Sequence, residues 1–71
     1  MKFEVGQEFV FKDSNKKHII KIIKIGYGVI YYKYIYSKID IINHKKFKRK
    51  IEDFKNKILD ITPEEFKITM L

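Results

Sequence analysis

The stretch from His18 to Tyr36, HIIKIIKIGYGVIYYKYIY, most constrains how this chain can fold. It consists almost entirely of β-branched and aromatic residues, which suit a pleated and half-buried surface. The break at Gly26-Tyr27-Gly28 puts glycine at both ends of a short connection, where positive φ angles are needed. The stretch therefore predicts a β-hairpin that supplies most of the core.

The segment before this hairpin predicts a first strand over about residues 7–12, because apolar and polar residues alternate in it. Residues 13–17 then form a polar turn. In the second strand Lys21 and Lys24 have opposite parity, so a bulge near residues 22–23 is needed to keep both ammonium groups outside the core. The residues expected inside are Ile20, Ile22 and Ile25.

Lys33 sets the phase of the third strand, because a lysine without a partner is rarely buried. The residues expected to face outward with it are Val29, Tyr31 and Ile35. The intervening residues then face the core, with the tyrosine hydroxyls reaching its rim; they are Ile30, Tyr32, Tyr34 and Tyr36.

The rest of the chain predicts a short fourth strand over residues 39–42 and a helix over residues 44–57, with Asn43 as its N-cap. Apolar residues in this helix recur at spacings of four, three and four, which places them on one stripe; they are Phe47, Ile51, Phe54 and Ile58. A last short strand is expected over residues 58–61. The TPEE sequence at 62–65 predicts the start of a short C-terminal helix, with threonine as cap and proline at the first position.

These elements follow one another in an order that resembles the small SH3-like barrels of phages, prophages and mobile elements in AT-rich bacteria. The residues that carry the resemblance are VGQEFVFK at 5–12, IIKIIKIGYGVIYYKYI at 19–35 and IINHKKFKRKI at 41–51. It implies a mainly β (α+β) chain that forms a single SH3-like domain over residues 1–71, a five-stranded barrel with a helix near residues 44–57 and a short C-terminal helix. Such proteins include nucleic-acid binders and inhibitors of host defence, so the resemblance favours a non-catalytic binding protein.

The chain has a formal net charge of +7, from sixteen basic and nine acidic residues. Such an excess favours polyanionic partners, either nucleic acid or an acidic protein surface. Fifteen of the sixteen basic residues are lysine, and an AT-rich genome by itself imposes a lysine-rich composition on the proteins it encodes. The net charge therefore leaves the choice of partner open.

The composition also argues against several classes of protein. Without cysteine there are no disulfides, thiolate nucleophiles or Cys-ligated metals, which suits a reducing cytoplasm. The N-terminus lacks the apolar run of a signal peptide, and lysines interrupt the hydrophobic hairpin too often for a membrane span. The histidines, His18 and His44, have no catalytic or metal-ligand set around them in the sequence. We therefore expect no enzymatic activity, no cofactor, no metal and no membrane, and a location in the cytoplasm of a bacterial host cell.

The basic run at residues 44–50 is the strongest indication of a binding site. Lys45 and Lys46 fall in the first turn of the expected helix, where the helix dipole disfavours cations, so an anion docked there would explain them. Tyr31, on the outer face with the hairpin lysines, could stack on a nucleic-acid base. The alternatives are a solvated lysine-rich surface and an inverted strand phase that buries Tyr31. The candidate binding residues are Lys21, Lys24, Tyr31, Lys33, Lys45, Lys46, Lys48 and Arg49.

Three functions remain open from the sequence. The first is a non-enzymatic basic module that contacts a nucleic-acid backbone. The second is an inhibitor encoded by a phage or mobile element, for example anti-CRISPR-like, that binds a host protein or protein–RNA complex. The third is a structural module that pairs through an exposed edge strand.

Overall fold

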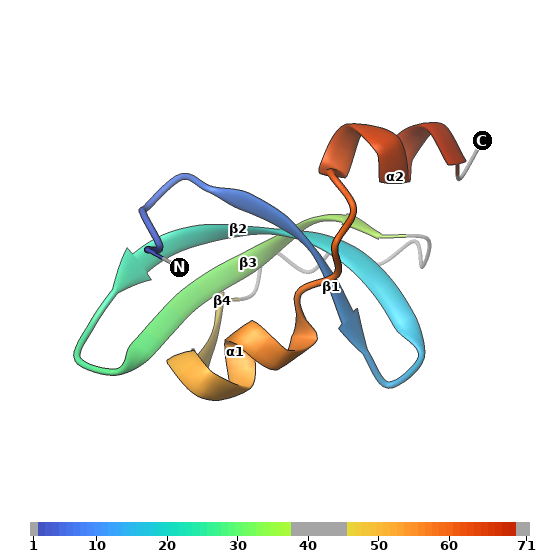
Figure 1. Cartoon of the computed structure of the whole chain (residues 1–71). Coiled ribbons are helices and arrows are strands. Elements are labelled where there is room, and N and C mark those ends of the chain that lie inside the picture. The colour runs from blue at the N-terminus through green and yellow to red at the C-terminus, as the bar shows by residue number, and fades with distance from the viewer. Residues whose placement is uncertain (1, 38–45, 70–71) are drawn as a thin grey trace.

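The computed structural model describes residues 2–37 and 46–69, and the described part is mainly β (Figure 1). Four strands form one antiparallel sheet in the order β1-β2-β3-β4, and two short helices follow. The strands are β1 (Glu8–Asp13), β2 (Lys16–Ile25), β3 (Val29–Ser37) and β4 (Lys46–Lys50), and the helices are α1 (Ile51–Lys57) and α2 (Pro63–Thr69). The mainly β fold is confirmed, with an open four-stranded sheet in the described ranges.

Tight turns join the first three strands, as the sequence predicts. Ser14 and Asn15, between β1 and β2, both have positive φ, at 48° and 66°, which suits a two-residue hairpin connection. Between β2 and β3 the Gly26 N–H donates to the Val29 carbonyl at 2.9 Å, and Gly28 has a φ of 67°. The glycine-containing turn therefore closes the long hairpin.

The bulge predicted in β2 is present. The register of β2 against β3 shifts between Ile22 and Lys24, and again between Ile19 and Ile20. Ile20 and Ile22 are fully buried while Lys24 is exposed, as expected. The prediction that Ile25 lies inside is wrong, because this residue ends β2 beside the turn and is 37% exposed.

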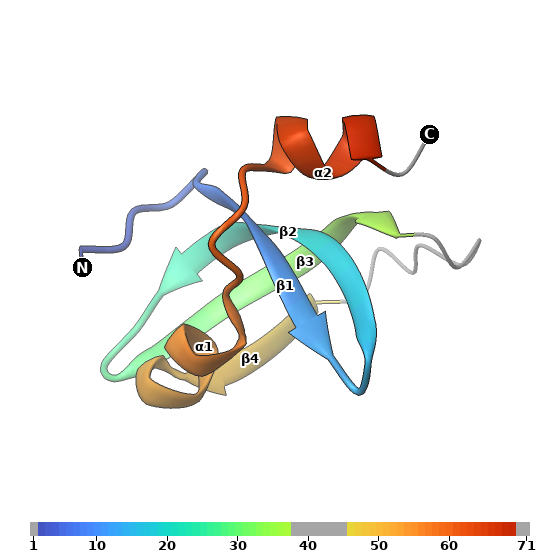
Figure 2. The ribbon, with the colours of Figure 1, turned by 45° about the vertical axis from the view of Figure 1, so that its right-hand side comes forward.

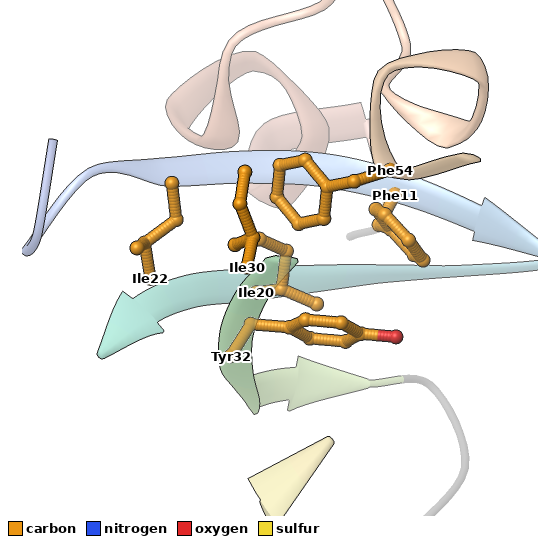
Figure 3. Packing of buried hydrophobic residues seen from close by; sticks show 6 residues of the cluster. All are labelled: Phe11, Ile20, Ile22, Ile30, Tyr32 and Phe54. Carbon is orange, nitrogen blue, oxygen red and sulfur yellow. The ribbon is translucent and has the colours of Figure 1, made fainter. Parts of the chain in front are cut away.

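The inner face of the sheet surrounds the main core (Figure 3). The buried members of this core are Phe11, Ile20, Ile22, Ile30, Tyr32 and Phe54. Phe54 comes from α1, and its ring lies 5.4 Å from that of Phe11 and 5.5 Å from that of Tyr32. The predicted phase of β3 is confirmed at Ile30, Tyr32 and the partly buried Tyr34; the side chain of Tyr36 lies outside the described part.

A second, smaller cluster lies on the outer face of the sheet. There α2 covers the sheet from the side opposite to α1 (Figures 1 and 2). Its buried members are Val10, Ile19 and Phe66, flanked by the partly buried Ile35, Leu59 and Ile61. Ile35 thus faces outward as predicted, yet it packs against apolar neighbours.

The predicted helix over residues 44–57 is wrong in its first half. Residues 46–50 form β4, which pairs with β3, and the helix begins only at Ile51. Phe47 reaches the core equally well from a strand, because Phe47 and Arg49 alternate with lysines and point to the inner side. A strand here also satisfies the backbone groups along the edge of β3.

The other predicted C-terminal elements have mixed outcomes. The strand over 39–42 and the N-cap Asn43 lie outside the described residues. Over 58–61 there is only an isolated bridge between Phe11 and Ile58. The C-terminal helix is confirmed, and its cap is Thr62, whose Oγ1 accepts a hydrogen bond from the Glu65 N–H at 3.1 Å.

Candidate functional site

Strand register brings lysines from three strands together on the outer face of the sheet. Lys21 of β2, Lys33 of β3 and Lys46 of β4 are aligned in one row across the strands. The next row is Lys24, Tyr31 and Lys48, and in the row after it Val29 is aligned with Lys50. We call this surface the lysine face, and its members are Lys21, Lys24, Tyr31, Lys33, Lys46, Lys48 and Lys50.

The lysine face has a high density of positive charge. Neighbouring strands lie about 4.8 Å apart and every second residue recurs after about 6.7 Å, so the Cα atoms of six lysines fit within roughly 10 by 13 Å. Lys21 and Lys33 are half-buried, and the other four are exposed. A polyanion could therefore meet several ammonium groups at once.

Little negative charge offsets these lysines. Within residues 2–37 and 46–69 the ion pairs join Arg49 to Asp13 and Asp53, and Lys57 to Asp13, and none involves the lysine face. In the rows of the described sheet, the one acidic residue aligned with the lysine face is Glu8 of β1, opposite Lys21. Like charges aligned across strands destabilise a sheet, so the arrangement carries a cost that an anionic ligand would relieve.

Tyr31 lies in the middle of the lysine face. Lys24 Nζ is 5.4 Å from the centroid of its ring, which is a cation–π distance. Beside the ring stands Gly26, where an added Cβ would lie 3.6 Å from Tyr31 Cε2. The expectation that Tyr31 faces outward is confirmed, and the alternative of a core position is excluded.

Arg49 does not share this surface with the lysines. Its position in β4 turns it to the inner side, where Nη1 donates to Asp53 Oδ2 at 2.7 Å, Nη2 to Asp13 Oδ2 at 3.2 Å and Nε to the Tyr32 hydroxyl at 2.9 Å. Burial opposes its charge, but the hydrogen bonds to Asp53 and Tyr32 outweigh that effect and raise the pKa of Arg49. Its bonds tie β1, β3 and β4 to α1, which is a structural role.

The helix-terminus explanation for Lys46 is wrong. Lys46 lies in a strand, five residues before α1 begins, so no helix dipole acts on it in the expected way. Lys45 lies outside the described residues. Lys50 belongs to the lysine face but is not among the candidates predicted from the sequence. In KFKRK at 46–50 lysines occupy every second position, a pattern that predicts a strand with Lys46, Lys48 and Lys50 on one face.

His18 occupies a structural position in β2. It is buried, and its ring stacks on that of Tyr34 with centroids 4.5 Å apart and an interplanar angle of 11°. Burial lowers its pKa, Asp13 acts in the opposite direction and Lys16 adds to the lowering. His44 lies outside the described residues. In the part of the chain that the structure describes, no three histidine or carboxylate side chains are grouped as a metal site.

A groove of about 680 Å³ lies elsewhere, between β1 and the segment that joins α1 to α2. Its charged lining residues are Glu8, Asp60, Glu65 and Lys55, a set that does not attract anions. Neither described helix is long and apolar enough to cross a membrane. Comparison of the chain with protein-family models, curated proteins and solved structures gives no match.

Proposed function

We propose that this protein is a non-enzymatic basic module that contacts a nucleic-acid backbone through the lysine face. The observation that carries the proposal is the alignment of six lysines across three paired strands, with no ion pair to any of them among the described residues. Phosphates of a bound strand would neutralise these charges and release condensed counterions, which is the main source of sequence-independent affinity for nucleic acids.

The lysines also fit contact with a phosphate backbone. Protein interfaces are enriched in arginine and depleted in lysine, because arginine makes bidentate and stacked contacts at lower desolvation cost. Here the one arginine, Arg49, is held by Asp13 and Asp53, and the exposed cations of this surface are all lysines. Lysines act as point charges on flexible stems, which suits contact with a repeating backbone.

The proposal carries three further predictions from the sequence. The five-stranded SH3-like barrel, and with it the resemblance to phage and mobile-element proteins, is supported by the curl of the sheet and by the bridge between Phe11 and Ile58, which lies where a fifth strand would meet β1. The absence of enzymatic activity and the location in the cytoplasm of a bacterial host remain predictions.

A charge-matched pair of triple variants tests the proposed function. One variant changes three lysines of the lysine face to Gln: Lys33, Lys46 and Lys48. The control variant changes three lysines elsewhere to Gln: Lys16, Lys55 and Lys67. Both variants lower the net charge of +7 by three. Because all six positions lie outside both cores, both variants should keep a normal thermal transition.

The measurement is the affinity for a fluorescent oligonucleotide as a function of salt. If about three to five phosphates are neutralised, the slope of log K against log salt should lie between about −2 and −4.5, at ~0.7–0.9 per phosphate. The lysine-face variant should have a slope shallower by about two units, and the control variant should keep the wild-type slope. If the wild type shows no salt-sensitive binding to DNA or RNA at ~50 mM salt, the proposal is wrong. A pull-down from host lysate then tests the alternative function, in which the protein inhibits a host protein by binding to it.

A further inference from the structure

We infer that the lysine face takes single-stranded rather than double-stranded nucleic acid, and that Tyr31 and Tyr27 each stack on one of its bases. This inference rests on the proposed function and names its substrate class. Three features of the structure support it: the curvature of the lysine face, the place of Tyr31 within it, and the exposure of Tyr27 at its end.

The lysine face lies on the convex side of the sheet. The sheet curls around the inner core and α1, so the surface opposite to that core bends outward (Figure 2). A duplex is itself a stiff convex rod, with a persistence length of about 150 base pairs. Two convex surfaces touch over a small area, whereas a flexible single strand can bend over the lysine rows.

Tyr31 offers a contact that only an unpaired base can use fully. Its ring lies between Lys24 and Lys48 in the same row, so a base stacked there would keep its phosphates close to both ammonium groups. Bases in a duplex already stack on each other and present only their edges in the grooves. A single strand exposes their faces, and stacking on an aromatic side chain is largely independent of the base.

Tyr27 provides a second ring where the lysine face ends. It occupies the turn directly after Lys24 and Ile25 and is fully exposed, so neither core of the described structure uses it. The glycines on either side leave the ring unshielded. Tyr31 is four positions after Tyr27, so their Cα atoms lie at most roughly 13 Å apart, the length of four residues of extended strand. That distance corresponds to at most about four nucleotides at the 3.4 Å rise of stacked bases.

Tyrosine variants measured on two probes separate stacking from charge. The probes are a twelve-nucleotide oligothymidylate and a twelve-base-pair DNA duplex at the same salt concentration. Tyr31→Leu and Tyr27→Leu should each weaken binding of the oligothymidylate by about 5- to 150-fold, as expected for one lost stacking contact, with an unchanged salt slope. Tyr31→Phe should bind the oligothymidylate with wild-type affinity, because the aromatic ring remains.

A direct readout accompanies these affinities. The chain has no tryptophan, so its intrinsic emission comes from tyrosine and should be quenched when oligothymidylate stacks on Tyr27 or Tyr31. The duplex should cause little quenching, and each Leu variant should lose part of the effect. Because Tyr27 is fully exposed, Tyr27→Leu keeps the test valid even if Tyr31→Leu fails to fold.

The two proposals fail in different ways. If single strand and duplex bind equally, both Leu variants match wild type and only the lysine variant changes the salt slope, then the lysine face binds backbone without stacking and this inference is wrong. If neither probe binds at low salt, the proposed function itself is wrong. Tighter binding of the single strand, together with its loss in Tyr27→Leu, supports the inference.

Discussion

The inner face of the sheet is closed by α1 around Phe54, whereas α2 covers the outer face only around Val10 and Ile19, and the rest of that face carries lysines. The same strands supply both faces, because successive side chains of a strand point to opposite sides. The buried residues of the inner face pack against one another. The lysines of the outer face contribute no apolar burial to either core, and their alignment costs repulsion. The difference predicts that stability depends mainly on the inner face, and it fits the proposal that the lysines of the outer face bind an anion.

The largest effect should come from the inner face. Phe54→Ala leaves a cavity among the rings of Phe3, Phe9, Phe11 and Tyr32, and should lower the free energy of unfolding by about 3–5 kcal/mol. That loss would unfold most molecules of a domain this small. Thermal unfolding followed by circular dichroism is the measurement. A normal transition in Phe54→Ala would show that the inner cluster is not the main source of stability.

The cluster under α2 should matter less. Phe66 is buried on the outer face, and Phe66→Ala should cost about 1.5–3 kcal/mol, the value for burial of one large apolar side chain. Hydrogen exchange should show lost protection in α2 while β2 and β3 keep theirs. Ile68→Ala, in the same helix but 70% exposed, is the matched control and should leave stability unchanged. Equal losses from Phe66→Ala and Phe54→Ala would remove the distinction between the two faces.

The sequence predicts the inner face better than the outer one. Period-two alternation, the glycine turn and the parity of Lys21 and Lys24 suffice for β1, the hairpin and its bulge, because each is a local signal. The first half of the helix over 44–57 fails since the four-three spacing of Phe47, Ile51 and Phe54 fits one helical stripe, while Phe47 reaches the same core from β4. Local spacing alone does not separate these alternatives.

Which residues make up the lysine face depends on how the strands pair, and the pairing of β4 with β3 joins distant parts of the sequence. Lys21, Lys33 and Lys46 share a row only because the bulge in β2 and the register of β4 align them. The bulge could be predicted from the parity of Lys21 and Lys24, but the register of β4 against β3 does not follow from the sequence of either strand. The position of Arg49 depends on the same pairing. Because residues 46–50 form a strand, its side chain points to the inner side and not to the lysine face.

Arg49 provides a test of whether the two faces are separate. Arg49→Lys keeps the charge but loses the forked contacts with Asp13, Asp53 and Tyr32, and should cost about 1–2 kcal/mol, since these groups are partly exposed. Affinity for nucleic acid should remain at the wild-type value, because the side chain lies on the inner side. Weaker binding by a folded Arg49→Lys protein would place Arg49 in the interface.

His18 should make the stability of the fold depend on pH. Its pKa in the folded protein is lowered by burial from the ordinary 6.5, so below that pH the unfolded chain binds more protons and the fold loses stability as the pH falls. A single proton contributes a slope of at most about 1.4 kcal/mol per pH unit. Unfolding measured between pH 7 and pH 5 should show this decline, and His18→Gln should flatten it. An equal decline in His18→Gln would assign it to other groups.

The smallest expected effect has opposite signs in stability and binding. Lys33 lies between Lys21 and Lys46, so Lys33→Glu replaces two like-charge pairs with two opposite-charge pairs across the strands. Stability should rise by about 0.2–1 kcal/mol, as for cross-strand ion pairs. Affinity for nucleic acid should fall, because the variant loses one cation and adds an anion in the middle of the lysine face.

The control for this exchange is Lys2→Glu, which makes the same change in net charge at an exposed position outside the sheet. It should leave stability unchanged and weaken binding far less than Lys33→Glu. Gain of stability with loss of affinity at Lys33 alone would mean that the aligned charges are kept for binding at the expense of the fold, as is common for functional sites. If Lys33→Glu instead lowers stability, the lysines of this face do not repel one another measurably, and the cost that an anion was expected to relieve does not exist.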